Sequence, residues 1–370
     1  MRFLMLNWRD PRNPLAGGAE RVTQGYLSAL QKRGHEVFWF AFNFPDALPV
    51  EVIDGITIVR GGSKGTSILR ARQWYKRQEP FDLVIDQHHG IPWFAPWWCQ
   101  TNCVAFLHEV LGPIWKSFYR WPLSILGPWQ EEWTHRLYRN VPFWTASSAT
   151  KRVLLERGVK NVTIIPYGVH TKALPALDPK PLLAPFQLAV VSRLAPNKRI
   201  DHAIQALGSL VARNVDAFLT IVGAGTEEQK LQDITRRLAL QKRIVFAGSL
   251  PEKEKDELLR RSHLLLHTSQ REGWGLNVIE ANAMGTPAVV YPVDGLIEST
   301  LHRETGLVAE SETPDALAAS IAELLGHPEE YQVYRQNAWE RAKTFHWDRV
   351  LPSACDWLES MAQNRSQRTR

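Results

Sequence analysis

The chain has 370 residues, a length that predicts two or three domains at roughly 100–200 residues per domain. Its 44% apolar and 22% charged content is ordinary for a globular protein and excludes wholesale disorder. The net charge is +6, and part of it comes from the arginines after residue 364. The remaining excess is too small to indicate a nucleic-acid partner, but it fits a small anionic one.

Neither a secreted nor a membrane-spanning protein is indicated. Three cysteines, Cys99, Cys103 and Cys355, form no zinc pattern and cannot all pair, which is typical of a reducing compartment. The first apolar run covers only residues 3–6, too short for a secretory signal. The longest stretch without Asp, Glu, Lys or Arg, residues 87–108, contains His, Pro, Asn and Gln and makes a poor membrane span. We therefore expect a cytoplasmic enzyme.

Short apolar runs alternate with longer amphipathic segments along the first half of the chain. This alternation predicts a parallel sheet covered by helices on both faces. Strands are expected at residues 3–6, 37–42, 56–59, 83–85, 104–107, 143–146 and 162–165, and the clearest helices at 19–32 and 148–157.

The alternation begins again after residue 186. Strands are expected at residues 188–191, 218–222, 244–247, 264–267, 288–291 and 307–308, and helices at 201–213, 227–240, 253–261 and 278–284. Three more helices follow at 314–325, 328–344 and 347–361. Because parallel crossovers are right-handed, each series predicts a doubly wound, Rossmann-like α/β domain.

Four prolines between residues 175 and 185 prevent regular structure and predict a semi-rigid linker. The expected organisation is an N-terminal domain over 1–172, a linker over 173–185 and a C-terminal domain over 186–345. A last helix with a basic tail occupies 346–370. We expect the two domains to face each other across a cleft, with ligands at the carboxyl ends of the strands.

The densest motif, Glu-Gly-Trp-Gly-Leu-Asn-Val-Ile-Glu over residues 272–280, directly follows the strand at 264–267. We expect Glu272 in the loop and Glu280 on a helix that begins near Leu276. Gly273 and Gly275 let the backbone approach a ligand, and the free N–H groups of the helix start suit a phosphate. The alternative is a glycine-rich turn followed by a solvated pair of glutamates.

Cations and further glycines follow other strands. Arg193 and Lys198 lie after the first strand of the second domain, where they could bind a diphosphate. Gly17 and Gly18 precede the first helix like a phosphate-binding loop, although they lack the dinucleotide fingerprint. Gly223 begins only a fragment of that fingerprint, Gly-Ala-Gly.

His108 follows the strand at 104–107 and could serve as a hydrogen-bond donor or an acid–base group, or be an ordinary loop histidine. A metal at His88 and His89 is disfavoured because no carboxylate or Cys spacing matches them. The sequence contains no D-x-D, H-E-x-x-H, G-x-S-x-G or Walker A motif. We therefore expect neither a metal nor a cofactor, and phosphate charge would be met by Arg, Lys and helix N-termini.

Together these motifs resemble family 4 of the retaining glycosyltransferases, which have the two-domain GT-B fold, over nearly the whole chain. The run over 272–287 is the most specific part of the resemblance. The other matching segments are Gly17–Glu20, Pro166–His170, Ser192–Lys198, Gly223–Gly225 and Phe246–Gly248.

The resemblance implies a hexosyltransferase of polysaccharide or glycoconjugate biosynthesis. It would move a hexose from a UDP- or GDP-sugar to a hydroxyl of a glycan, a lipid-linked or a small-molecule acceptor. The anomeric configuration would be retained and no metal would be needed. Arg193 and Lys198 would neutralise the donor diphosphate, Glu272 would hold sugar hydroxyls, and Glu280 would accept from the ribose. The remaining donor-binding positions would be Gly223, Gly273, Trp274, Gly275 and Leu276.

In the first domain, which would bind the acceptor, His108 matches the family's histidine near the reacting carbon. Gly17 and Gly18 would let their loop approach the diphosphate and the acceptor, and the helix at 347–361 would cross back to brace this domain. The chain departs from the family pattern at several positions around the donor site, which bears on the choice of donor. These positions are Trp274, His267, Asn277, Asn282 and Arg199.

Eleven of the fifteen tryptophans precede residue 150, and the segment 111–129 is aromatic and basic without an acidic residue. It could contact anionic lipid at the inner face of the cell membrane, stack on a glycan acceptor, or belong to the protein core. Two other functions also stay open. One is a GT-B-shaped epimerase or phosphorylase, and the other is a non-catalytic carbohydrate-binding protein. The carbohydrate-binding function would leave the predicted phosphate site of the second domain without a purpose.

Overall fold

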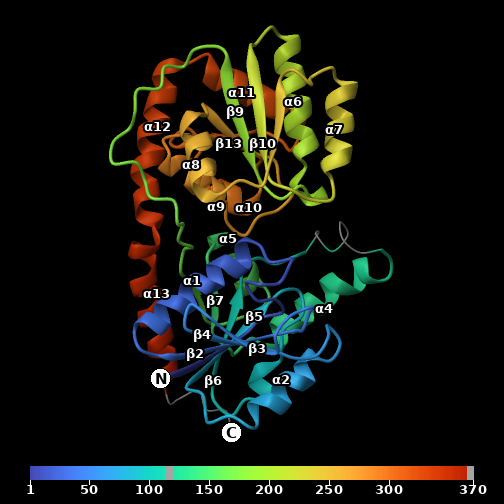
Figure 1. The fold of residues 1–370 in the computed structure, drawn as a ribbon, viewed down its shortest axis with the longest axis vertical. Helices are drawn as coiled ribbons and strands as arrows, with labels where there is room; N and C mark the ends of the chain where they lie inside the picture. Colours follow the sequence, from blue (N-terminus) through green and yellow to red (C-terminus); the bar gives the residue numbers. More distant parts are fainter. Residues whose placement is uncertain (113–114, 116–119, 365–370) are drawn as a thin grey trace. The chain divides into compact units, whose positions relative to one another are not determined.

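A computed structural model describes residues 1–112, 115 and 120–364 (Figure 1). The chain forms two compact units. The first unit is Met1–Gly168 together with Trp347–Arg370, and the second unit is Val169–His346. The first boundary between the units follows Gly168, whereas the sequence predicts it after residue 172. The proline-rich segment 173–185 belongs to the second unit.

The first unit contains an eight-stranded sheet in the order β3-β4-β2-β1-β5-β6-β7-β8. β5 and β6 are buried along their whole length, as is typical of central strands in a sheet that is covered on both faces. Most of their residues are apolar, but Asp86, Gln87 and His88 of β5 are buried polar residues. The strands are β1 (Arg2–Leu6), β2 (Glu36–Ala41), β3 (Val50–Ile53), β4 (Ile56–Arg60), β5 (Leu83–His88), β6 (Asn102–Leu107), β7 (Phe143–Thr145) and β8 (Val162–Ile164).

The expectation of a purely parallel sheet is wrong at one edge, where β3 pairs antiparallel with β4. Asp54 and Gly55 connect the two strands with φ of 50° and 76°. Two positive φ values in a two-residue loop indicate a type I′ turn, which favours Asp-Gly. The dipeptide is visible in the sequence and would have predicted this hairpin.

The helices of the first unit include two that the sequence analysis did not predict, α2 and α4. Ile68 and Trp74 of α2 pack on Leu4, Leu6 and Phe40, whereas α1 packs against α13. The helices are α1 (Gly18–Lys32), α2 (Ser67–Tyr75), the short η1 (Ala95–Trp97), α4 (Leu123–Leu137), α5 (Ser148–Glu156) and α13 (Trp347–Gln363). Over the described part of the chain, no helix has both the length and the apolar character needed to cross a membrane.

The second unit contains a six-stranded parallel sheet in the order β11-β10-β9-β12-β13-β14. Every strand expected in this half of the sequence is present. The strands are β9 (Phe186–Val191), β10 (Ala217–Val222), β11 (Ile244–Gly248), β12 (Leu264–His267), β13 (Ala288–Val290) and β14 (Gly306–Val308). Since β9 lies between β10 and β12, the strand order reverses at β9, and ligands of such sheets bind outside the carboxyl ends of the strands at this point.

Helices surround the second sheet and share one apolar core with it. They are η2 (Pro196–Lys198), α6 (Ile200–Ala212), α7 (Glu228–Arg237), α8 (Glu252–Arg261), α9 (Leu276–Ala283), α10 (Asp294–Ser299), α11 (Pro314–Leu325), α12 (Pro328–Ala342) and η3 (Lys343–Phe345). α10 was not predicted.

Trp347, the first residue of α13, fixes the last helix to the first unit. Its indole is buried and lies edge-on to Tyr26, with ring centroids 5.2 Å apart. A Cβ added at Gly25 or at Gly168 would lie 2.9 Å or 2.4 Å from this indole. Both glycines therefore make the space in which the tryptophan sits.

We predict that Trp347→Ala lowers the free energy of unfolding by about 3–5 kcal/mol, because it leaves a large cavity between α1 and α13. Chemical denaturation measures the change, and limited proteolysis would show faster cleavage near residue 347. The control is Trp121→Ala, whose side chain is 78% exposed and whose effect should stay within about 0.5 kcal/mol. Equal stabilities of the two variants would contradict the assignment.

Candidate functional site

Three of the predicted charged residues of the second unit follow strands at the reversal point of its sheet. Arg193 and Lys198 follow β9, and Glu272 follows β12, the strand beside it. Because β9 and β12 are parallel neighbours, their carboxyl ends meet at one edge of the sheet. The fold thus brings together groups that are more than seventy positions apart in the sequence.

Lys198 and Glu272 form an ion pair between Nζ and Oε1. The same carboxylate oxygen accepts a hydrogen bond of 2.8 Å from Ser269 Oγ and lies 3.5 Å from His267 Nε2. Burial favours a higher pKa for Glu272, but Lys198, His267 and Ser269 outweigh it and hold the pKa below its ordinary value. Glu272 is therefore ionised at neutral pH.

Arg199 ties the loop of Lys198 to the loop of Glu272. Its backbone is left-handed, with φ of 47°, which explains why a glycine suits this position. The guanidinium donates to the main-chain oxygens of Thr268 and Ser269, each at 3.0 Å, and to Glu312 at 2.6 Å. Thr268 Oγ1 in turn donates to the Lys198 carbonyl at 2.9 Å. These hydrogen bonds hold together the two loops that carry the ion pair.

Arg193 is exposed and, within the described residues, its side chain makes no hydrogen bond or ion pair. The main chain beside it is fixed by Gly223, where an added Cβ would lie 1.8 Å from the Ser192 carbonyl oxygen and φ is 134°. Gly223 therefore lets the loop after β10 lie directly on the backbone after β9. This close packing explains why position 223 is a glycine, and no bound ligand is needed to explain it.

The acidic motif has the local structure that the sequence predicts, with Glu272 in the loop and Glu280 on α9. Gly275 is the N-cap residue of α9, and a Cβ on it would lie 2.5 Å from Ser299 Oγ. Gly295, at the start of α10, donates its N–H to the Glu272 carbonyl at 3.1 Å. Sequence reasoning missed Gly295, because nothing local to it indicates that α10 packs against this loop.

The other members of the motif are held by packing. Gly273 is buried, and Leu276 is the half-buried first residue of α9. The Trp274 ring lies 5.6 Å from the ring of Phe345. Nδ2 of Asn277 donates to the Val191 carbonyl at 2.7 Å and ties α9 to β9.

Glu280 has a partner that the sequence did not reveal, Lys255 on α8, whose Nζ lies 3.0 Å from Glu280 Oε2. Lys255 is buried and also contacts Glu252 at 2.5 Å. Burial raises the pKa of Glu280 despite the attraction of the lysine. Lysines are common on helix surfaces, so no local pattern distinguishes this buried one from its neighbour Lys253.

In the first unit, Gly17 and Gly18 form the start of α1. The Gly17 N–H donates to Glu20 Oε2 at 2.7 Å, and the same carboxylate forms a 3.0 Å ion pair with Arg9. Arg9 also donates to the Leu15 carbonyl at 2.9 Å. The glycine loop is thus held by a buried charge pair.

His108 lies directly after β6 and has a hydrogen-bond partner at each ring nitrogen. Nε2 is 2.8 Å from Gln87 Nε2, and Nδ1 is 2.5 Å from the Tyr167 hydroxyl. Burial, with the nearby His89 and Arg9, lowers the pKa of His108 to about 3. The ring is therefore neutral at physiological pH, and it could reach a sugar only by exchanging a partner. Sequence reasoning missed both partners.

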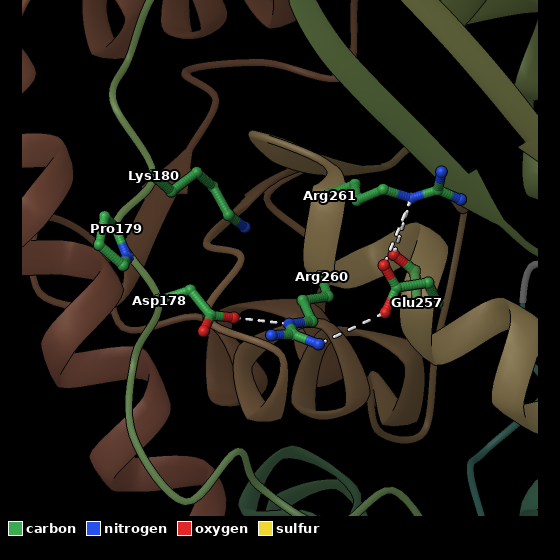
Figure 2. A pocket seen from close by; sticks show the side chains of 6 residues that line it. All are labelled: Asp178, Pro179, Lys180, Glu257, Arg260 and Arg261. Atoms are coloured by element: carbon green, nitrogen blue, oxygen red, sulfur yellow. Dashed lines mark hydrogen bonds and ion pairs between the residues drawn. The ribbon is translucent and has the colours of Figure 1, made fainter.

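A cavity of about 390 Å³ in the second unit lies away from these loops (Figure 2). Its Lys180 donates to the carbonyl of Ser262 at 2.8 Å, and Ser262 precedes β12, whereas Glu272 follows the other end of this strand. Its Arg260 pairs with Asp178 at 2.5 Å, and burial lowers the pKa of Lys180 to about 6. These cations are poor candidates for a diphosphate site. Across the described ranges, no three His, Cys, Asp or Glu side chains are grouped so as to hold a metal ion.

Two family models match consecutive parts of the chain. Residues 16–173 match the model described as Glycosyltransferase Family 4, and residues 179–341 match that of Glycosyl transferases group 1. The chain belongs to glycosyltransferase family 4. The resemblance of its motifs to this family is thereby confirmed.

Relatives of this family 4 chain include a glycogen synthase from Mycobacterium tuberculosis, 31% identical over 194 residues, which are 52% of this chain and 47% of the relative. A GDP-mannose-dependent alpha-(1-6)-phosphatidylinositol dimannoside mannosyltransferase from the same species is 30% identical over 213 residues, 55% of this chain and 54% of the relative. The chain thus spans about half the length of these curated relatives.

Solved structures confirm the expected fold class, two Rossmann-like domains of the GT-B type. A sucrose-phosphate synthase from Thermosynechococcus elongatus aligns with a TM-score of 0.78 at 18% identity, over 97% of this chain and 98% of that chain. Anabaena Alr3699/HepE in complex with UDP-glucose aligns with a TM-score of 0.75 at 19% identity, over 97% and 100% of the two chains. At these identities the likeness establishes the fold.

We predict that Lys255→Met lowers the free energy of unfolding by about 3–5 kcal/mol at pH 7, because it leaves the Glu280 carboxylate buried without its cation. Denaturant titration measures this loss. The deficit should narrow as the pH falls, since burial raises the pKa of Glu280 and protonation removes its buried charge. Lys253→Met, on the exposed side of the same helix, should change stability by less than about 0.5 kcal/mol; similar losses in both variants would refute the role of Lys255.

We also predict that the protein loses stability as the pH falls from 7 to 5. Burial lowers the pKa of His88 and His108 to about 3, of His135 to about 2 and of His267 to about 4. Below the ordinary value near 6.5 the unfolded chain binds protons that the folded chain does not, which costs roughly 2 kcal/mol per histidine at pH 5. Asp86, whose pKa burial raises to about 6, acts in the opposite sense and offsets part of the loss.

Melting temperatures recorded across this pH range test the sum of these effects. His108→Gln should reduce the number of protons taken up on unfolding by about one, and so should weaken the dependence of stability on pH. A melting temperature that does not change between pH 7 and pH 5 would show that the histidines titrate normally.

Proposed function

We propose that this chain is a retaining hexosyltransferase. Its donor is a UDP- or GDP-sugar and its acceptor a hydroxyl of a glycan, a lipid-linked or a small-molecule compound. The observation that carries the proposal is the ionised Glu272 paired with Lys198 at the reversal point of the second sheet, together with the exposed Arg193, whose side chain has no partner among the residues that the structure describes. The family and the nucleotide-sugar names of its relatives and structural neighbours support the donor class.

The barrier to transfer is charge separation, because an oxocarbenium-like sugar parts from a negatively charged diphosphate. Arg193 and Lys198 would stabilise the leaving diphosphate more strongly than the intact donor, since negative charge develops there as the bond breaks. Glu272 would accept hydrogen bonds from sugar hydroxyls, and Glu280 from the ribose. These cations supply the charge, and the sequence lacks D-x-D, so we propose that neither a metal nor a cofactor takes part.

Retention follows if the acceptor attacks from the face that the diphosphate leaves. The bond between the anomeric carbon and the phosphate oxygen breaks, a bond to the acceptor oxygen forms, and the acceptor proton passes to the departing phosphate. Because His108 is neutral at physiological pH, its role in this step would be hydrogen bonding rather than proton donation. The acceptor would bind to the first unit, near Gly17, Gly18 and His108.

Incubation with a panel of UDP-, GDP-, ADP- and TDP-sugars and mixed acceptors tests the proposal. Transfer in the presence of EDTA, with the donor's anomeric configuration in the product by NMR, is the expected result. A strict requirement for manganese or an inverted product would overturn the mechanism. Turnover of the donor to its epimer without an acceptor, or binding of glycans without any turnover, would overturn the transferase function itself.

We predict that Arg193→Ala and Lys198→Ala each lower kcat/KM by about 100-fold or more, because each removes positive charge at the leaving diphosphate. Melting temperature should change little for Arg193→Ala, since this side chain is exposed. Arg237→Ala at the end of α7 is the matched control and should retain full activity. Wild-type activity in Arg193→Ala would contradict the assigned role.

A further inference from the structure

Helix α4 of the first unit has an unusual distribution of side chains. Its buried positions include Gly127, Glu131, Thr134 and His135, which are small or polar. Glu131 accepts from the backbone N–H groups of residues 111 and 112 at 2.7 and 3.0 Å. The helix is thus attached to the fold by its polar side, so its apolar residues are not needed for that attachment.

The apolar residues lie on the opposite side, which we call the α4 face. It consists of Ile125, Leu126, Trp129, Trp133 and Leu137, whose spacing puts them on one side of a helix. All five are exposed, Trp129 by 66% and Trp133 by 49%, and Trp121 just before the helix by 78%. Isolated exposed apolar residues are ordinary, but a contiguous set of this size marks an interaction surface.

The charges around the α4 face are mainly positive. Arg120, Arg136 and Arg139 are exposed, whereas Glu132 pairs with Arg136 at 2.6 Å and Glu131 is buried. The same bias extends over the whole first unit, whose sequence has 24 Lys and Arg against 16 Asp and Glu, while the second unit has 20 against 22. The positive charge of the protein therefore belongs to the unit that carries the α4 face.

From this combination we infer that the α4 face docks on the surface of an anionic lipid bilayer. Tryptophan rings are favoured at the depth of lipid headgroups, and arginines beside them attract anionic lipid. A second copy of the chain is a poorer occupant, because it would bring two sets of arginines into one interface. Of the segment 111–129 in which sequence analysis considered lipid contact, residues 113–114 and 116–119 lie outside the described residues, and the inference rests on residues 120–139.

This inference goes beyond the proposed function, and its test uses neither donor nor acceptor. The full-length protein is sedimented with vesicles of phosphatidylcholine alone or mixed with phosphatidylglycerol, at low and high salt. We expect binding to the anionic vesicles that weakens at high salt. Trp129→Gln/Trp133→Gln should lower the bound-to-free ratio on these vesicles by about tenfold or more.

The matched control is Leu69→Gln/Val333→Gln, which replaces equally exposed apolar residues on α2 and α12 and should bind like the wild type. Arg120→Gln/Arg136→Gln/Arg139→Gln should remove most of the salt-sensitive part of binding. Because the replaced side chains are exposed, melting temperatures should not change. If the double tryptophan variant does not fold, Trp121→Gln, which lies outside the helix, replaces it and should also weaken binding.

Three results would overturn the inference. The wild type could fail to sediment with anionic vesicles at low salt, or the tryptophan variants could bind as well as the wild type. Light scattering could also show a dimer that the tryptophan variants dissociate, without vesicle binding, which would make the α4 face an interface between copies.

Discussion

The second unit depends on one constraint, the charge balance between Lys198 and Glu272 at the reversal point of its sheet. The two side chains satisfy each other across neighbouring loops, so neither is left as an uncompensated charge in a half-buried position. A diphosphate near Lys198 would compete with Glu272 for the ammonium group and free carboxylate lone pairs for sugar hydroxyls. The pair would therefore couple the binding of the two ends of a donor. Arg193 has no side-chain partner in the described residues, so it would add positive charge without first giving up an ion pair.

Most of the surrounding contacts serve to keep these groups in place. Arg199 joins the loops of Lys198 and Glu272, Gly223 allows direct contact between main chains, and Asn277 ties α9 to β9. A fixed array of charges stabilises a transition state better than a mobile one, because little reorganisation is needed when charge develops. Arg199 and Asn277, two positions expected from the sequence to depart from the family pattern, thus take part in the framework around Lys198 and Glu272.

The sequence predicted the strands of both sheets except the edge strand β3, because buried parallel strands are mostly apolar and the helices between them amphipathic. It also placed Glu272 in a loop and Glu280 on a helix, since glycines precede an apolar helical pattern. Partners that meet only through space could not be predicted. Lys255 resembles any surface lysine, and the Gln87 and Tyr167 contacts of His108 depend on strand order. Helix α4 was missed because Gly127, Pro128 and an outward apolar face obscure the usual pattern.

The assignment of α13 to the first unit has a consequence for biosynthesis. The second unit is one continuous segment, Val169–His346, inserted between two parts of the first. On the ribosome the second unit is therefore complete before the first, because the first unit includes α13, which follows the second unit in the chain. At the usual 5–20 residues per second, synthesis of the second unit delays α13 by roughly 10–35 s. During that time the surface of α1 that later receives Trp347 lacks the indole that covers it in the folded protein.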